Sequence, residues 1–277
     1  MVLKLGLIGG NIRASRSPAL HRIAGRLSGV EVSYDLLIPA ELGLDFDGVL
    51  AKLRAEGYRG VNVTYPFKEL AVSRVRVADP ALRRLGAVNT VVFGPAGPEG
   101  FNTDYTGFAA AYRARFGAQG PGRVALIGTG GVGRAIGFAL AELGAQELRL
   151  FDRDAAKTVA LQRALAATGG PRLVACDSVV AAVTDADGVV NATPVGMVGT
   201  PGTPVPAALW AGRGWAFDAV YTPVETEFTR AAAAAGAAVL SGWELFFHQG
   251  IDAFAIFAGR PVADPGRLRA ELLAGAG

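Results

Sequence analysis

The sequence predicts an α/β protein with two domains, and three observations support this fold class. The chain has 277 residues, which at roughly 150 residues per domain corresponds to two domains. Short apolar runs alternate with longer amphipathic segments, a pattern typical of mostly parallel sheets covered by helices. The alternation occurs in two series, which the turn-rich stretch 117–122 separates.

The first series predicts five strands with helices between them. Strands are expected at Leu3–Ile8, Val32–Ile38, Gly60–Thr64, about 87–93 and about 100–103. Helices are expected at about 18–28, 47–56, 67–76 and 106–116.

The second series begins at Arg123, and the chain ends in helix. Strands are expected at Val124–Ile127, Glu147–Phe151, and about 172–175, 188–192, 215–220 and 237–240. Helices are expected after the first of these strands to about 143, and at about 154–167, Trp243–Phe257 and 265–274. We therefore expect an N-terminal α/β domain made of residues 1–105 and 242–277, and a second domain made of residues 106–241.

Charge and cysteine content exclude several classes of partner. The net charge is +3, from 27 basic and 24 acidic residues that are interspersed, whereas nucleic-acid binding usually needs a clustered basic face. One cysteine excludes an intramolecular disulfide, and with two histidines it makes a metal site unexpected. Since we find neither a signal peptide nor an apolar run of about 18 residues, we expect a soluble cytoplasmic protein, a monomer or a homodimer, without nucleic-acid or membrane partners.

A glycine-rich turn opens the second series. The apolar strand Val124–Ile127 leads into Gly-Thr-Gly-Gly-Val-Gly, and a predicted helix follows. In the spacing G-x-G-x-x-G, the glycines permit the tight turn, the approach of a pyrophosphate and close packing of helix on strand. The helix N-terminus favours the anion. The turn therefore predicts a Rossmann-type dinucleotide-binding domain, with an ordinary glycine-rich turn as the alternative. Its cofactor-binding residues are expected to be Gly128, Gly130, Gly131, Val132 and Gly133.

Asp152 indicates which dinucleotide is bound. It ends the next predicted strand, about 20 residues after Gly133. A carboxylate there accepts hydrogen bonds from the ribose hydroxyls and repels a 2′-phosphate, so NAD is the expected cofactor. Arg153 follows directly, and a guanidinium tolerates the phosphate, which leaves NADP as the less favoured alternative.

Two serines follow the first strand. Ser17 and Pro18 have the residue types of a helix N-cap and a first helical residue. Either Ser15 and Ser17 only cap this helix, or their hydroxyls hold a substrate carboxylate at its N-terminus.

Other polar residues lie where the next strands end. Asn62 and Thr64 alternate onto one face of the third strand, and Lys68 lies near the start of the following helix. A lysine there is unfavourable for the helix dipole, so its position suggests a function, although a single lysine is usually just solvated. Asn89 lies in an apolar segment, where an amide needs a hydrogen-bond partner. Asp104 follows the next strand.

Taken together, these motifs resemble the shikimate dehydrogenase family over nearly the whole chain. They occur in the family's order: Asn62-Val-Thr64-Tyr-Pro66-Phe-Lys68, Ala87-Val-Asn89-Thr90, Asn102-Thr-Asp104, the Gly128–Gly133 turn, Asn191-Ala-Thr193-Pro-Val-Gly196-Met197 and Gln249. The family reduces 3-dehydroshikimate to shikimate reversibly with NAD(P)H in aromatic amino acid biosynthesis, and some members act on quinate. The resemblance implies an NAD(P)-dependent oxidoreductase that acts on a CH–OH group.

The resemblance also implies a role for each matching residue. Lys68 and Asp104 match the catalytic pair beside the reacting carbonyl, and Ser15 and Ser17 match the residues that hold the substrate carboxylate. Residues matching those that bind the ring or lie near the substrate are Asn62, Thr64, Asn89, Tyr221 and Gln249, and residues matching the loop along the nicotinamide include Thr193 and Met197.

The chain departs from the family's common pattern at three places. Tyr105-Thr106 follows the aspartate of the Asn-Thr-Asp motif where a glycine is frequent, and Glu244-Leu245 precedes the Gln249 segment where Gly-Met is common. Asp152-Arg153-Asp154 replaces an Asn-Arg-Thr motif that binds the NADP phosphate, which favours NAD and the quinate/shikimate branch. The alternatives are a quinate-preferring or related cyclohexane-carboxylate dehydrogenase and, in another class, a non-catalytic NAD-binding sensor.

Overall fold

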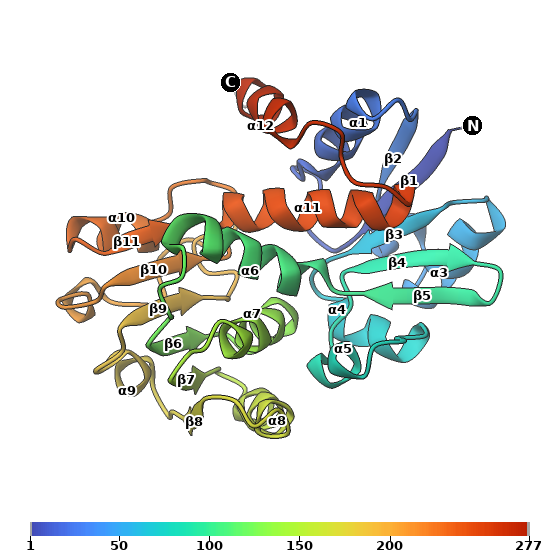
Figure 1. Cartoon of the computed structure of the whole chain (residues 1–277). Coiled ribbons are helices and arrows are strands. Elements are labelled where there is room, and N and C mark those ends of the chain that lie inside the picture. Colours follow the sequence, from blue (N-terminus) through green and yellow to red (C-terminus); the bar gives the residue numbers. More distant parts are fainter. Residues whose placement is uncertain (1, 276–277) are drawn as a thin grey trace. The chain divides into compact units, whose positions relative to one another are not determined.

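A computed structural model of the chain describes residues 2–275. They form two compact units, one made of the described residues up to Thr103 and from Phe247 onward, the other of Asp104–Phe246. The two boundaries fall within helices α6 (Thr103–Phe116) and α11 (Gly242–Ala258) (Figure 1). Each unit contains one sheet with helices around it, which confirms the predicted α/β class.

The first unit contains a five-stranded sheet in the order β2-β1-β3-β4-β5. β1 pairs in parallel with β2 and β3, whereas β4 is antiparallel to both of its neighbours, β3 and β5. The strands are β1 (Leu3–Ile8), β2 (Val32–Leu37), β3 (Gly60–Val63), β4 (Thr90–Gly94) and β5 (Gly97–Phe101). Because β1 and β3 are parallel neighbours, the segments that carry the predicted serines and Lys68 leave the sheet at the same edge.

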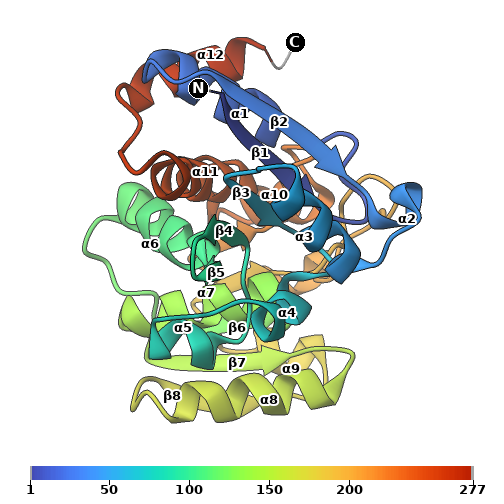
Figure 2. The same cartoon turned by 90° about the vertical axis from the view of Figure 1, so that its right-hand side faces the viewer.

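The helices of the first unit come from both ends of the chain. They are α1 (Ser17–Leu27), α2 (Pro39–Leu42), α3 (Phe46–Ala55), α4 (Lys68–Ala71), the 3-10 turn η1 (Val72–Arg74), α5 (Pro80–Leu85), the later part of α11, and α12 (Pro265–Ala274). α12 packs beside α1 (Figures 1 and 2). α11 approaches the sheet closely at Gly60, where an added Cβ would lie 2.6 Å from Phe257 Cε1.

The second unit contains a six-stranded sheet in the order β11-β10-β9-β6-β7-β8, and all its pairings are parallel. The strands are β6 (Arg123–Ile127), β7 (Glu147–Phe151), β8 (Arg172–Ala175), β9 (Gly188–Asn191), β10 (Trp215–Asp218) and β11 (Ala238–Leu240). The helices are the rest of α6 and α11, α7 (Gly131–Glu142), α8 (Ala155–Ala166), α9 (Val179–Val183), η2 (Ala207–Leu209) and α10 (Glu227–Ala234). The strand order reverses between β6 and β9, as in a doubly wound dinucleotide-binding sheet.

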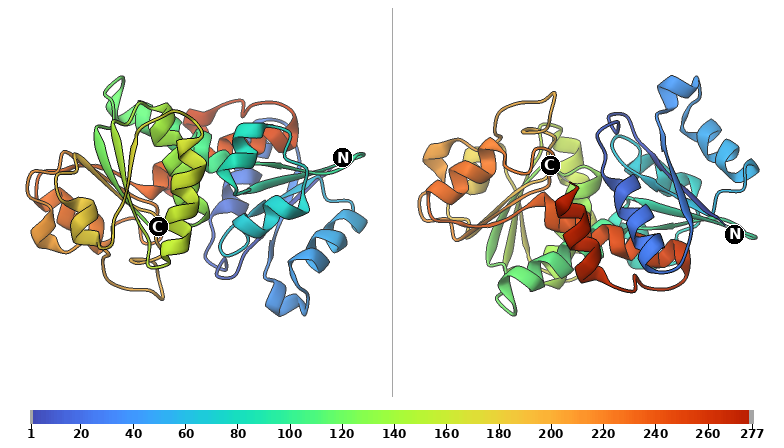
Figure 3. Two further views of the ribbon diagram at one scale, coloured as in Figure 1. Left: turned by 90° about the horizontal axis from the view of Figure 1, so that it is seen from below. Right: turned by 90° about the horizontal axis from the view of Figure 1, so that it is seen from above.

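Helices cover both faces of this second sheet (Figure 3). Ala125 and Ile127 of β6 lie in one core with Val183 of α9 and Phe228 of α10. Leu126, between them in the strand, points to the other face and lies beside Gly137 of α7. Neighbouring residues of a strand point to opposite faces, so a fully apolar strand indicates that both faces are covered.

The chain differs from the predicted elements in a few places. The helix expected at about 67–76 ends early, because Arg76 leaves it to form a bridge with Glu99 of β5. The strand expected at about 87–93 begins only at Thr90, since the amide of Val88 donates to Lys68 O outside the sheet. Four short helices, α2, α5, α9 and α10, were not predicted. Among residues 2–275, no helix combines the length and hydropathy that a membrane span needs.

Candidate active site

The two serines lie together at the start of α1. Ser15 Oγ lies 3.2 Å from Ser17 Oγ and accepts a hydrogen bond of the same length from the Ser17 amide. The prediction that Ser17 is the N-cap is wrong: the cap position is Arg16, Ser17 is the first helical residue, and no side chain caps the helix. The guanidinium of Arg16 instead donates to Leu272 O at the end of α12. The hydroxyl pair therefore lies at a helix N-terminus, where an anion is favoured.

The segment after β3 lies beside the loop after β1. The amide of Gly10 donates to Tyr65 O over 3.0 Å, and the amide of Thr64 donates to Ile8 O over 2.9 Å. A Cβ on Gly9 would lie 2.4 Å from Thr64 Cγ2, so the backbone of the first loop is in close contact with that threonine. Lys68 is the first residue of α4, as the sequence predicted.

Asn89 lies at the centre of a buried hydrogen-bond network. Its Oδ1 accepts from the Thr103 amide over 2.7 Å and from the Thr90 hydroxyl over 3.0 Å, and its Nδ2 donates to Thr103 Oγ1 over 2.9 Å. Thr103 Oγ1 also donates to Gln249 Oε1 over 3.4 Å. The structure thus brings together two of the predicted ring-binding residues, Asn89 and Gln249, with Thr103 between them.

Both the oxygen and the nitrogen of the Asn62 side-chain amide have hydrogen-bond partners in the first unit. Its Oδ1 accepts from the Tyr34 hydroxyl over 2.8 Å, and its Nδ2 donates to Thr90 Oγ1 over 3.1 Å. The Asn62 side chain is buried, as are those of Tyr34 and Thr90. Asp104 follows Thr103 directly in the first turn of α6 and is also buried.

The glycine-rich turn of the second unit has no room for a side chain at Gly128 and Gly133. An added Cβ would lie 2.8 Å from the carbonyl carbon of Ala192 at Gly128, and 2.0 Å from Gly128 O at Gly133. Gly128 has φ +94°, a left-handed conformation that favours glycine. Gly130 is the N-cap of α7, so the free backbone amides of the helix start next to the turn. These features are those of a pyrophosphate-binding loop, a glycine-rich turn followed by a helix N-terminus.

Asp152 is held at this turn by three hydrogen bonds. Its Oδ2 accepts from the Thr129 amide over 2.7 Å and from the Thr129 hydroxyl over 3.2 Å. Its Oδ1 accepts from the Asp154 amide over 3.0 Å. Asp154 itself caps α8 by accepting from the Ala156 amide, and Arg153 is exposed.

The loops after β9 and β10 are linked by buried polar side chains. Asn191 Oδ1 accepts from the amide and the hydroxyl of Thr193, and its Nδ2 donates to Val195 O over 3.0 Å. The same Nδ2 donates to Asp218 Oδ1 over 2.9 Å, which joins the two loops. Tyr221, in the second loop, stacks on Phe246 with ring centroids 4.9 Å apart.

Comparison with known proteins connects this geometry to one family. The family described as "Shikimate dehydrogenase substrate binding domain" matches residues 7–91. The chain is 42% identical over 264 residues to the "Shikimate dehydrogenase (NADP(+))" of Streptomyces avermitilis, covering 92% of this chain and 90% of the relative. It is 37% identical to the "Quinate/shikimate dehydrogenase (NAD(+))" of Corynebacterium efficiens, covering 97% of both.

This chain belongs to the shikimate dehydrogenase family. Quinate dehydrogenase from Corynebacterium glutamicum in complex with NAD has a similar structure, with a TM-score of 0.87, 34% identity and 99% of both chains covered. Shikimate 5-dehydrogenase from Thermus thermophilus in complex with NADP(H) and shikimate has a TM-score of 0.83 and 34% identity, covering 98% of this chain and 99% of that chain. The chain is therefore an NAD(P)-dependent oxidoreductase acting on a CH–OH group, as the motifs predicted.

One departure from the family pattern has a structural explanation in the second unit. The Tyr105 hydroxyl donates to the Glu142 carboxylate of α7, which also accepts from Arg113 over 2.8 Å. The Tyr105 hydroxyl, followed by Arg113, lowers the pKa of Glu142. Tyr105 therefore links α6 to α7. Glu244, a second departure, lies in the first turn of α11.

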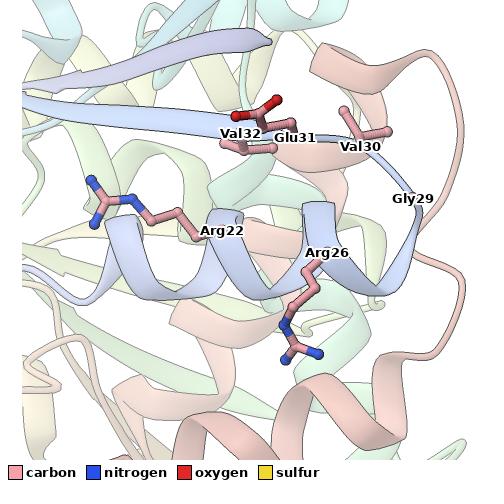
Figure 4. Close-up of a pocket in the computed structure, with 6 residues that line it drawn as sticks. All are labelled: Arg22, Arg26, Gly29, Val30, Glu31 and Val32. Carbon is pink, nitrogen blue, oxygen red and sulfur yellow. The ribbon is translucent and has the colours of Figure 1, made fainter. Parts of the chain in front are cut away.

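An open hollow elsewhere on the first unit contains none of the predicted site residues. It lies between α1 and β2 and is lined by Arg22, Arg26, Gly29, Val30, Glu31 and Val32 (Figure 4). The two guanidinium groups point in different directions, and each has a structural partner: Arg22 donates to Tyr34 O, and Arg26 pairs with Glu271. In the part of the chain that the structure describes, no cluster of three His, Cys, Asp or Glu side chains is placed to bind a metal.

Sequence reasoning did not identify Asp218 and Thr129 as residues that organise the site. Asp218 is fully buried, and besides Asn191 it accepts from the Val220 amide and the Thr226 hydroxyl. An ionisable residue at the end of the apolar strand Trp215–Asp218 was the signal that could have indicated it. Thr129 gave no such signal, because its hydroxyl donates to Asp152, which follows the next strand and is distant in sequence.

Asp218 predicts a specific dependence of stability on pH. Burial raises its pKa from 3.8 to about 6, although its three hydrogen bonds oppose the shift. The folded protein then binds the proton more tightly than the unfolded chain, so Asp218 makes the free energy of unfolding fall as pH rises from about 4 to about 6. Asp218→Asn removes this titration. We expect the difference in unfolding free energy, wild type minus variant, to fall by up to about 3 kcal/mol across that interval.

Urea denaturation of both proteins at several pH values measures this difference directly. The comparison with the Asp218→Asn variant cancels the titration of the other carboxylates, which the two proteins share. A difference that stays constant or rises between pH values of about 4 and about 6 would contradict the assignment.

Proposed function

We propose that this chain is an NAD-preferring dehydrogenase that interconverts shikimate and 3-dehydroshikimate. The observation that carries the proposal is the Asp152 carboxylate, held by Thr129 at the glycine-rich turn. In this position it is oriented to accept from a ribose diol, and its charge repels the 2′-phosphate that distinguishes NADP. Arg153, the residue that would tolerate the phosphate, is exposed.

We assign the two halves of the chemistry to the two units. The first unit, together with Asp104, binds the ring carboxylate, and the second unit binds the dinucleotide through Gly128, Gly130, Gly131, Val132, Gly133 and Asp152, with Thr193 and Met197 along the nicotinamide. A bound nicotinamide supplies or accepts the hydride.

The Ser15 and Ser17 hydroxyls hold the substrate carboxylate. The rest of the substrate contacts Thr64, Asn89, Tyr221 and Gln249. Asn62 hydrogen-bonds through both ends of its amide to Tyr34 and Thr90, and so stabilises these substrate-binding residues without contacting the substrate.

Lys68 and Asp104 act on the reacting oxygen. When hydride reaches the carbonyl carbon, that oxygen gains negative charge, and a cation directed at it stabilises the transition state. Lys68 supplies this charge and a proton, and Asp104 orients the ammonium. In the oxidative direction Lys68 accepts the proton of the substrate hydroxyl, which requires either a deprotonated fraction of the lysine or a relay of the proton through Asp104.

Quinate is the second candidate substrate. The relatives named for NAD are also named for quinate, and the NAD complex of quinate dehydrogenase superposes on 99% of this chain. The relatives named for NADP are named for shikimate alone. Among these curated relatives, the names that carry NAD(+) are also the names that carry quinate.

The test is a spectrophotometric comparison of shikimate and quinate, each with NAD and with NADP. We expect the highest kcat/KM for shikimate with NAD. NAD should exceed NADP by about 100-fold, because like charges a few ångströms apart near a protein surface repel by about 1–4 kcal/mol. Higher efficiency with NADP would overturn the cofactor assignment, and higher efficiency with quinate would establish the second candidate. A folded protein that binds NAD but converts neither substrate would support a sensor.

A further inference from the structure

A continuous series of buried hydrogen bonds crosses the first unit from β2 to α11. Its members are Tyr34, Asn62, Thr90, Asn89, Thr103 and Gln249. Only Gln249 among them is more than slightly exposed, and the others are at most 6% exposed. An amide has chemically different ends, so such a network fixes which end of each amide faces each neighbour.

Asn62 determines which groups of the network donate and which accept. The Tyr34 hydroxyl donates to Asn62 Oδ1, and the His21 ring stacks on Tyr34 with centroids 4.9 Å apart. Burial lowers the pKa of His21 to about 3, so the ring is neutral at ordinary pH. With its oxygen held on this side, Asn62 directs Nδ2 toward Thr90 Oγ1.

Thr90 determines which end of the Asn89 amide faces it. Its oxygen accepts from Asn62, and its single proton goes to Asn89 Oδ1. The Thr103 amide donates to the same oxygen, so two donors hold Oδ1 on the protein side. Nδ2 of Asn89 has two protons, and one goes to Thr103 Oγ1.

We propose that Thr90 is a positioning residue that makes Asn89 a hydrogen-bond donor toward the substrate. This rests on the proposed function, which places Asn89 against the ring. Thr90 is 0% exposed, so its hydroxyl acts on the substrate through Asn89 and not by direct contact. The series ends at Gln249, whose Oε1 lies 3.4 Å from Thr103 Oγ1; the single proton of that hydroxyl is shared between Gln249 Oε1 and Asn89 Oδ1.

The consequence is a specificity for the group that Asn89 contacts. A ring oxygen there must accept a hydrogen bond, which a hydroxyl or a keto oxygen does. A protonated amino group has protons but no lone pair, and two donors would then face each other. The network thus selects an oxygen-substituted ring against the corresponding amine.

Thr90→Val tests the positioning role, because valine has the shape of threonine without the hydroxyl. Asn89 then loses one of the two donors that hold Oδ1, and its amide can turn. We expect KM for shikimate to rise about tenfold, the effect of one lost hydrogen bond, with kcat changed less than about twofold and KM for NAD unchanged. Thr90→Ser restores the hydroxyl and should return KM to within about twofold of wild type.

Two further variants separate positioning from loss of stability. Val91→Ala removes buried packing from the same strand without removing a hydrogen bond, and should lower the unfolding temperature while leaving KM unchanged. Asn89→Asp presents an oxygen in place of Nδ2 and should raise KM by more than Thr90→Val does.

The outcomes distinguish this inference from the proposed function. If the wild type converts shikimate and Thr90→Val keeps a wild-type KM, or if Thr90→Ser fails to restore it, Thr90 does not position Asn89. A wild-type KM in Asn89→Asp would show that no donor is needed there. If the wild type converts neither shikimate nor quinate, the proposed function itself has failed.

Discussion

Lys68→Met is expected to lower kcat about 10³-fold, the range found when a general acid or an oxyanion donor is removed. Methionine keeps the length of the lysine stem but has neither charge nor proton. Because the lost interaction forms mainly in the transition state, KM for shikimate should change much less than kcat. Initial rates in both directions measure both parameters.

A second lysine of the same unit provides the control. Lys52, on α3, is exposed and pairs with Glu56 one helical turn away. Lys52→Met removes the same charge from the surface, and its kcat should equal that of the wild type. If Lys68→Met stays folded, binds NAD normally and keeps turnover within about tenfold of the wild type, the acid/base assignment is wrong.

Asp152→Asn is expected to remove most of the preference for NAD. Asparagine keeps the shape, and its Oδ1 can still accept from Thr129, but the charge that repels a 2′-phosphate is lost. We expect the ratio of kcat/KM for NAD over NADP to fall from about 100 to below about 10, since one unscreened charge contact accounts for most of the difference. KM for NAD should rise as well, because bonds from the ribose hydroxyls to a neutral oxygen are weaker.

Asp154→Asn is the matched control for this variant. It removes one negative charge two residues further along the chain, and asparagine is as good a helix N-cap as aspartate. The NAD preference should be unchanged in this protein. Equal loss of preference in both variants would mean that general charge, not the position of Asp152, decides between the cofactors.

The elements that could be predicted from the sequence are those whose pattern is local. β1, β7, β8 and α12 have the predicted bounds, since each is an apolar or amphipathic run between clear breakers. The glycine-rich turn was predictable because close contacts at Gly128 and Gly133 permit only glycine there. The short helices α5, α9 and α10 are too short to show a clear hydrophobic period. Their N-cap residues Asp79, Ser178 and Thr226, whose side chains accept from the first helical turn, were the available signals.

The remaining features depend on contacts between distant segments. Ser17 has the residue type of an N-cap, but the cap falls at Arg16, which is anchored to α12 at Leu272, near the other end of the chain. Asn62 shares the face of its strand with Thr64, yet its amide is used by Tyr34 and Thr90. No local pattern shows which polar residue of a strand faces the ligand and which one supports it, because the difference lies in its neighbours in space.

The arrangement of the first unit also sets an order of events during synthesis. Its core joins the beginning and the end of the chain: His21 of α1 lies against Phe254 and Phe257 of α11. The second unit is continuous in sequence, so all its strands have left the ribosome while the first unit still lacks the later part of α11. A nascent chain can therefore complete its nucleotide-binding sheet first and must keep the N-terminal strands from aggregating until α11 has been synthesised.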